Sequence, residues 1–187
     1  MRTIYAIGDS HCLHAWHKIP GVVAGGMGAM TMHNFGSSRS VVVAHIPEDA
    51  VACFCWGEID CRCHVHVHQP WKETIDTLVK NYLHTIDLNA EVHKRIWIYN
   101  VVPPPRREGI ITLQENPSFP FVGDNAARLS YVRYMNQKLK ESKYPFVDVY
   151  DKYADADGFL LIPLSDCHVH ISDEKYLMEW VEAHRDD

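Results

Sequence analysis

The sequence lacks a basic excess and a long apolar run. Its 187 residues include 18 Lys and Arg against 24 Asp and Glu, and the formal net charge is −6. A nucleic-acid partner needs a positive surface that neutralises phosphates, so we expect none. The longest mostly apolar stretches, 50–56 and 159–164, are far shorter than the ~20 residues that cross a bilayer. We therefore expect a soluble protein with no membrane partner.

Disulfide spacing and an export signal are also missing. Four of the six cysteines lie within residues 53–63, and cysteines at alternate positions of one strand do not suit disulfide geometry. The apolar run near the start is interrupted at Gly8 and Asp9, which makes it too short for a signal-peptide core. We expect a cytoplasmic protein with reduced thiols.

The composition is that of an ordinary globular domain. Hydrophobic residues make up 47% of the chain and charged residues 22%, close to the average for packed soluble domains. The chain has no internal repeat and no low-complexity linker, and its length suits one hydrophobic core. We expect residues 1–187 to form a single domain.

Short apolar runs alternate with helical patterns along the chain. Strands are predicted at 3–8, 50–56, 95–102 and 146–150, with a further strand-like segment at 159–164. Helices are predicted directly after the first strand, over 71–92, from a cap at Asp124 or Asn125 to about residue 143, and from a cap at Ser172 or Asp173 through residue 182. The glycine-bearing segment 20–40 and the proline-bearing segment 103–123 predict loops.

This alternation predicts an α/β protein. Strands that alternate with helices form a mostly parallel sheet with helices on both faces. Ligands of such sheets bind beyond the C-terminal ends of the strands. We therefore look for chemistry at the residues that follow each predicted strand.

Ser10 lies where the first predicted strand ends and the following helix begins. A hydroxyl at this edge of the sheet lies beside free backbone N–H groups, a suitable position for a nucleophile. The alternative is that Asp9 or Ser10 only caps the helix. A partner for Ser10 elsewhere in the chain decides between the two.

Asp166 and His170, in the loop before the last predicted helix, could be that partner. A serine hydroxyl is a weak nucleophile at neutral pH. It needs an imidazole to accept its proton and a carboxylate to orient the imidazole. His170 could accept the proton, and Asp166 could orient the ring.

Three blocks of the sequence together resemble the SGNH/GDSL hydrolases. They are Gly-Asp-Ser at 8–10, Gly-Glu-Ile-Asp at 57–60, and the late pair Asp166 and His170. The resemblance extends over most of the chain. It implies a three-layer α/β/α sandwich, flavodoxin-like, in which Ser10 is the nucleophile, His170 the base and Asp166 its orienter. It also implies action on esters, often acyl groups on carbohydrates.

The block at 57–60 departs from the family pattern. The family usually has Gly-x-Asn-Asp, in which the Asn side chain helps to hold the oxyanion; this chain keeps Gly57 and Asp60 but has Ile59 instead of Asn. Loss of one oxyanion donor typically costs ~3 kcal/mol of transition-state stabilisation. Arg62 is our candidate for a replacement donor.

The last block departs as well. The family usually has Asp-x-x-His, but here Val169 is the third residue after Asp166, and His168 and His170 flank it. We favour His170 as the base because the residues at 171–172 look like the usual entry into the last helix. His168 is the alternative.

The family also takes an oxyanion N–H from a glycine after the second strand. Gly28 and Gly36 both lie in the corresponding segment, and the sequence does not choose between them. Each could instead be a turn glycine that needs positive φ. Asn34 could reach the site as a replacement amide donor.

A run of histidines offers a competing, metal-based interpretation. His64, His66 and His68 would share one face of an extended segment and could bind zinc with Cys61 or Cys63, or with the cluster Asp166, His168 and His170. The alternative is a loop or helix start whose histidines bond locally or face solvent. No standard zinc-ligand spacing supports a site, so we expect no metal and no cofactor.

Our leading hypothesis is a serine esterase acting on a small-molecule or carbohydrate ester, in which an O-acetyl group is the acyl group expected from the family. The rival is an SGNH-like protein that binds a glycan or a metal with weak or no catalysis, for which Ile59 is the best argument. The oligomeric state is not predicted.

Overall fold

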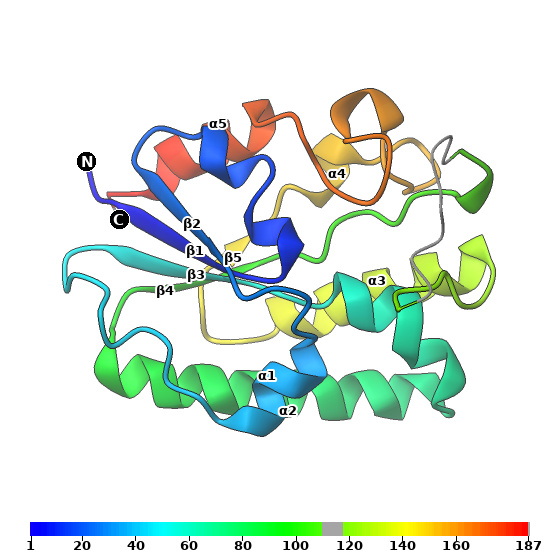
Figure 1. Cartoon of the computed structure of the whole chain (residues 1–187), viewed down its shortest axis with the longest axis horizontal. Coiled ribbons are helices and arrows are strands. Elements are labelled where there is room, and N and C mark those ends of the chain that lie inside the picture. Colours follow the sequence, from blue (N-terminus) through cyan, green and yellow to red (C-terminus); the bar gives the residue numbers. More distant parts are fainter. Residues whose placement is uncertain (110–117, 187) are drawn as a thin grey trace.

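The computed structural model describes residues 1–109 and 118–186 and contains one parallel sheet at its centre (Figure 1). Its strands are β1 (Ile4–Gly8), β2 (Val22–Gly26), β3 (Val51–Cys55), β4 (Ile96–Tyr99) and β5 (Phe146–Val147). They lie in the order β2-β1-β3-β4-β5, and every neighbouring pair is parallel. The predicted α/β class is confirmed.

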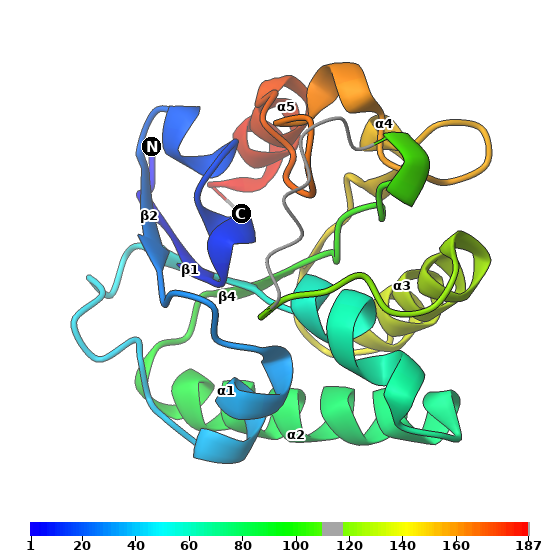
Figure 2. The ribbon, with the colours of Figure 1, turned by 45° about the vertical axis from the view of Figure 1, so that its right-hand side comes forward.

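Helices cover both faces of the sheet, as Figures 1 and 2 show. One face carries α1 (Met32–Ser38), α2 (Trp71–Val92) and α3 (Asn125–Lys140). The other carries α4 (Tyr150–Tyr153), α5 (Lys175–His184) and the turns after β1. The architecture is therefore the predicted three-layer α/β/α sandwich.

The two cores are built from alternate residues of the same strands. In β3, Ala52 and Phe54 pack with the core under α1, α2 and α3, whereas Val51, Cys53 and Cys55 pack with the core under α5. Every residue of β3 is buried. A central parallel strand, covered on both faces, accordingly appears in sequence as a continuous apolar run.

The segment 20–40 is not a loop, contrary to our prediction. It contains β2, an edge strand rich in small residues, and α1, which Thr31 caps by accepting a hydrogen bond from the backbone N–H of Asn34. Half-exposed glycine and alanine give no apolar signal. Pairing with β1 therefore fixes β2, and packing against α2 fixes α1, although the intrinsic propensities of their residues do not predict either element.

The connection after β1 also differs from prediction. Two short 3₁₀ turns, Ser10–Cys12 and Trp16–Lys18, replace the predicted helix. Trp16 is fully buried, and its ring meets Tyr99 edge-on with ring centroids 5.2 Å apart. The spacing of the apolar residues after β1 correctly indicated that some of them are buried, but two 3₁₀ turns, rather than one helix, bury them.

Three predicted boundaries near the C-terminal end change. The strand predicted at 146–150 shortens to β5, because α4 begins at Tyr150. The strand-like segment at 159–164 ends in a 3₁₀ turn, Ile162–Leu164. The last helix begins at Lys175, after Glu174, rather than at a cap on Ser172 or Asp173. Part of the loop predicted at 103–123 lies outside the described residues.

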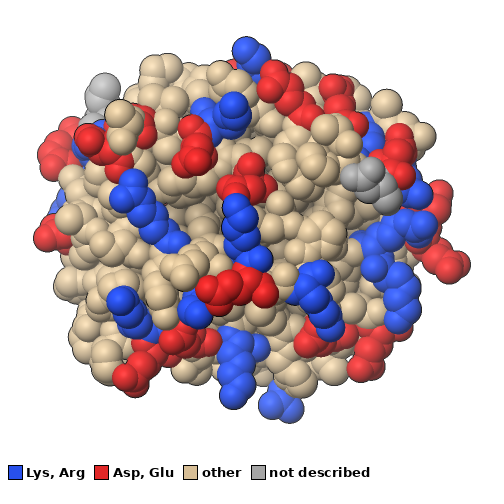
Figure 3. All heavy atoms as spheres, turned by 180° about the vertical axis from the view of Figure 1, so that it is seen from behind, with Lys and Arg blue, Asp and Glu red and all other residues tan. Residues whose placement is uncertain are grey.

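The surface carries mixed charge on the face that Figure 3 shows, where Lys and Arg lie among Asp and Glu. No helix in the described parts of the chain is both long enough and apolar enough to span a bilayer. All six cysteines are free thiols.

Candidate active site

Ser10 follows β1 at the C-terminal edge of the sheet. Gly8 makes this turn possible, because a Cβ at this position would lie 1.9 Å from the carbonyl oxygen of Cys55 in the neighbouring strand. The Asp9 side chain caps the turn by accepting the backbone N–H of His11 at 2.9 Å. Capping is thus the work of Asp9, which leaves the Ser10 hydroxyl available for another partner.

That partner is His170. Its Nε2 lies 2.8 Å from Oγ of Ser10, and its Nδ1 lies 2.6 Å from Oδ2 of Asp166. Because the Asp166 carboxylate can only accept, Nδ1 of His170 donates to it and Nε2 is left to accept the serine proton. The structure thus brings together Ser10, Asp166 and His170 with the tautomer that general-base chemistry needs.

The loop that carries this pair is closed on itself. Ser165 and Ile171 form a bridge across it, and Oδ1 of Asp166 accepts the backbone N–H groups of His168 and His170. Partial burial would raise the pKa of Asp166, but the hydrogen bond and charge of His170 hold that pKa well below its ordinary value. Asp166 is therefore an ionised, fixed acceptor at neutral pH.

A buried charge network that sequence reasoning missed lies beneath the site. Nδ1 of His11 lies 2.9 Å from Oδ1 of Asp9, and Nε2 of His11 lies 3.3 Å from the carbonyl oxygen of Val169. Glu58 forms a two-point ion pair with Arg62, at 2.6 and 3.1 Å. The exposed fraction of each of these four charged side chains is 8% or less. A histidine directly after the Gly-Asp-Ser block was the available signal.

The charges of this network sustain one another. Burial acts to lower the pKa of His11, but the neighbouring Asp9 carboxylate outweighs it and raises that pKa above its ordinary value. Burial likewise acts to raise the pKa of Glu58, and Arg62 outweighs it, so that this pKa is lowered. Through its contact with the carbonyl oxygen of Val169, His11 supports the loop that carries His170.

His14 is a second histidine that the sequence did not single out. Its ring stacks on that of His170, with centroids 3.8 Å apart and planes tilted by 11°. Burial and the charge of His170 lower the pKa of His14 to about 4. A neutral imidazole therefore covers one face of the candidate base at neutral pH.

A cavity of about 220 Å³ opens at Ser10. Its lining consists of Ser10, Gly28, Ala29, Ile59, Arg62, Phe119, Phe121, His168, Val169 and His170. Of the two candidate glycines, Gly28 lies here, with φ of +68° and open space where a Cβ would project. The predicted site residues Arg62 and His168 also border this cavity.

The positions of Ile59 and Arg62 show which of the expected hydrogen-bond donors for the oxyanion are present. Ile59 is buried and lines the cavity where the family pattern has an amide. Arg62 lines it too; three of its five N–H groups donate to Glu58 and to the carbonyl oxygen of Phe119, which leaves one N–H on each of Nη1 and Nη2. Backbone N–H groups at Ser10 and Gly28 are the other candidates.

Gly36 and Gly57 serve packing rather than the cavity. A Cβ on Gly36 would lie 2.9 Å from the backbone nitrogen of Tyr82, so this glycine lets α1 and α2 approach closely. Gly57, with φ of +121°, is enclosed by side chains that include Met135 and Val101. The expectation that Gly36 supplies an oxyanion N–H does not fit its position, and Gly57 does not line the cavity at Ser10 either.

Asp60 lies behind the cavity and holds the segment that borders it. Its two carboxylate oxygens accept the backbone N–H groups of Met32 at 2.7 Å and His33 at 3.1 Å. Burial raises the pKa of Asp60 to about 7, against the lowering effect of these two hydrogen bonds. Asp60 is thus a support for the 28–33 segment, not a group that faces Ser10.

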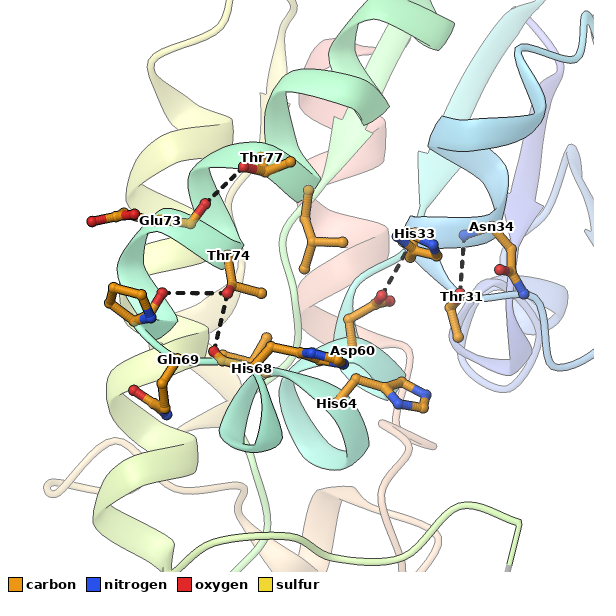
Figure 4. Close-up of a pocket in the computed structure, with 13 residues that line it drawn as sticks. Thr31, His33, Asn34, Asp60, His64, His68, Gln69, Glu73, Thr74 and Thr77 are labelled. Atoms are coloured by element: carbon orange, nitrogen blue, oxygen red, sulfur yellow. Dashed lines mark hydrogen bonds between the residues drawn. The ribbon is translucent and has the colours of Figure 1, made fainter.

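A second cavity, of about 600 Å³, borders Thr31 and His33 of that segment (Figure 4). The predicted residues Asn34, Asp60, His64 and His68 line it, together with His33 and residues of the first turns of α2. Asn34 therefore belongs to this cavity and not to the one at Ser10.

The run His64, His66 and His68 is not extended. Residues 60–67 form a π turn followed by a 3₁₀ turn, so alternate residues do not share a face, and Nδ1 of His66 bonds to the hydroxyl of Tyr131 at 2.9 Å. This agrees with the local alternative rather than with a zinc site built on the run. Among the described residues, the potential metal ligands that cluster are His14, Asp166 and His170.

Comparison with known proteins gives matches in structure only. No family model and no curated protein matches the sequence. A GDSL-like lipase from Bacteroides thetaiotaomicron is 16% identical, with a TM-score of 0.62 over 96% of this chain and 84% of that one. A protein assigned as an acylhydrolase from Bacteroides fragilis is 17% identical, with a TM-score of 0.67 over 97% and 85%.

A carbohydrate acetylesterase family member from Sinorhizobium meliloti matches over almost the full length of both chains. It is 17% identical, with a TM-score of 0.59 over 98% of this chain and 96% of that one. At such identities the likeness concerns the fold. The chain therefore has the fold of the SGNH/GDSL hydrolases that its sequence blocks resemble.

Proposed function

We propose that this protein is a serine esterase in which Ser10 is the nucleophile, His170 the general base and Asp166 its orienter. The observation that carries the proposal is the hydrogen-bonded chain from Asp166 through His170 to Ser10, with lengths of 2.6 and 2.8 Å. Ser10 and His170 are 160 residues apart in sequence. Because the side chain of Asp9 caps the turn, the hydroxyl of Ser10 is not needed as a cap.

The reaction follows from this geometry. Nε2 of His170 accepts the hydroxyl proton as Oγ of Ser10 attacks the ester carbonyl, and the proton then passes to the departing alcohol. Water, activated by the same imidazole, hydrolyses the acyl-serine and releases the acid. Asp166 stays ionised throughout and stabilises the imidazolium that forms on His170.

The oxyanion in this scheme is held by backbone N–H groups of Ser10 and Gly28. Ile59 replaces the side-chain amide that the family uses, and the contacts of Arg62 with Glu58 and with the carbonyl oxygen of Phe119 use three of its five N–H groups. Since one donor is typically worth ~3 kcal/mol, we expect turnover to be slower than in an esterase with the complete set.

The cavity favours a short acyl group. Its volume of about 220 Å³ is small, and Ile59, Phe119 and Phe121 give it an apolar wall. A likeness to a carbohydrate acetylesterase supports acetyl as the acyl group and a carbohydrate as the alcohol. The choice of acetyl and carbohydrate rests on fold-level analogy.

A fluorophosphonate probe tests the nucleophile and its base together. The intact mass of the wild-type protein should increase by one phosphonyl group, and Ser10→Ala and His170→Ala should remove the adduct. Ser37→Ala is the matched control, because Ser37 is an exposed serine of α1. An unlabelled but folded wild-type protein would refute an activated serine.

The second candidate is a binding protein with this fold and little catalysis. The observation that favours it is Ile59, which removes the usual oxyanion amide, together with the second cavity of about 600 Å³. Absence of labelling, with tight binding of an uncleaved ester or glycan, would support this candidate.

A further inference from the structure

His14, Asp166 and His170 form a cluster of potential metal ligands. One ligand atom from each residue can be chosen such that all three lie within 4.8 Å of one another. The rings of His14 and His170 are stacked at 3.8 Å, and Asp166 lies at the edge of the His170 ring. His14 has no part in the proposed reaction, so the cluster contains one residue that the esterase does not require.

We propose that these three residues bind a zinc ion, and that the zinc-bound protein is inactive. Two imidazoles and one carboxylate form a donor set that zinc commonly takes, with a fourth position left for water. The nitrogen donors favour zinc over magnesium, which prefers oxygen ligands. His14 and His170 are half-buried and Asp166 is exposed, so an ion can reach the cluster from solvent.

Zinc binding needs only local rearrangement. The ion takes the place of the proton on Nδ1 of His170, and that proton moves to Nε2, so the ring stays a neutral imidazole. Zinc ligands lie about 2 Å from the ion, so the contact of 2.6 Å between Asp166 and His170 must open slightly. The ring of His14 must also rotate out of the stack, to direct a nitrogen rather than its face at the ion. His14 lies between two 3₁₀ turns, outside regular secondary structure.

The effect on the reaction follows from the shared ligands. With zinc on Nδ1, the imidazole carries its proton on Nε2 and cannot accept the proton of Ser10, and a zinc-bound carboxylate no longer orients the ring. Zinc therefore competes directly with general-base catalysis. The inhibition rests on the proposed esterase function, whereas binding of the metal does not.

The test measures zinc binding and hydrolysis separately on the full chain. Protein freed of metal with a chelator is titrated with zinc chloride by calorimetry, and hydrolysis of p-nitrophenyl acetate is followed with and without zinc. His14→Phe keeps an aromatic ring on His170 but removes the ligand nitrogen. His17→Ala is the matched control, because His17 is a nearby exposed histidine.

We expect the wild-type protein and His17→Ala to bind one zinc ion at this cluster and to lose hydrolysis, which the chelator restores. His14→Phe should bind zinc at least about tenfold more weakly at this site and should keep its hydrolysis in zinc. Magnesium chloride should have no effect on either protein. His14→Gln replaces His14→Phe if the latter does not fold.

Two outcomes separate the proposals. Equal zinc affinity and equal inhibition in the wild-type protein and His14→Phe would overturn the zinc site while leaving the esterase intact. Zinc binding that depends on His14, in a protein that hydrolyses no ester even in chelator, would refute the esterase and keep the zinc site.

Discussion

Asp60 gives the sharpest test of the physical reasoning, because two effects on its carboxylate oppose each other. The side chain is 1% exposed, and burial disfavours its charged form. Its two oxygens accept the N–H groups of Met32 and His33, which favours the charged form. Burial is the larger effect, and the pKa of Asp60 is raised to about 7.

The magnitude follows from linkage between protonation and folding. The pKa rises from 3.8 to about 7, and at about 1.4 kcal/mol per pKa unit this corresponds to at most about 4 kcal/mol of unfolding free energy. Because the folded-state pKa is raised, this stability is fully present below about pH 4 and is lost as the pH rises to about 7. Asp60→Asn cannot ionise and has no such dependence.

The assay is urea denaturation of the wild-type protein and Asp60→Asn between about pH 4 and about pH 8. The free energy of unfolding of the wild-type protein should fall relative to that of the variant across this range, by up to about 4 kcal/mol. Taking the difference cancels the titration of His11, His14 and the other groups common to both proteins.

A difference that changes in the opposite direction would refute this reasoning. If the wild-type protein gains stability relative to Asp60→Asn as the pH rises, the two backbone hydrogen bonds outweigh burial, and Asp60 is ionised at neutral pH. A flat difference would show that burial and hydrogen bonding cancel.

Two further predictions concern packing and buried charge. Gly8→Ala should destabilise the fold by more than about 3 kcal/mol, because its Cβ would lie 1.9 Å from the carbonyl oxygen of Cys55. Gly25→Ala, whose nearest atom is 3.8 Å away, should lose much less in the same thermal melt, and equal losses would contradict the steric argument. Arg62→Met should lower the free energy of unfolding by about 3–5 kcal/mol, because it leaves the buried Glu58 without Arg62. Adding Glu58→Gln should recover part of this stability. An unchanged melting temperature in Arg62→Met would show that the pair contributes nothing to stability.

The sequence was informative where the signal is local. The continuous apolar runs of β3 and β4 reflect strands covered on both faces, and the predicted helix over 71–92 is α2. The segment containing α1 gave no such signal, since Gly36, Asn34 and its neighbours are weak helix formers. That helix depends on tertiary contacts with α2, including the hydroxyl of Thr85, which donates to the carbonyl oxygen of Gly36 at 2.9 Å.

The candidate site divides in the same way. The order of Gly-Asp-Ser and Asp-His in the sequence pointed to Ser10 and Asp166 and favoured His170 as the base, with His168 as the alternative. It did not indicate that Gly36 and Asn34 lie away from Ser10, because both are in the expected segment and only the path of the chain through space separates them.

The sequence was sufficient to predict β1, β3, β4 and β5, their α/β order, and Ser10 and Asp166 as candidate site residues, with His170 favoured over His168 as the base. The tertiary structure alone decided the 2.8 Å contact between Ser10 and His170, the stacking of His14 on that imidazole, and the burial of His11 against Asp9. The physical reason is that periodicity and turn chemistry act over a few residues, whereas these contacts depend on how a sheet brings distant loops to one edge.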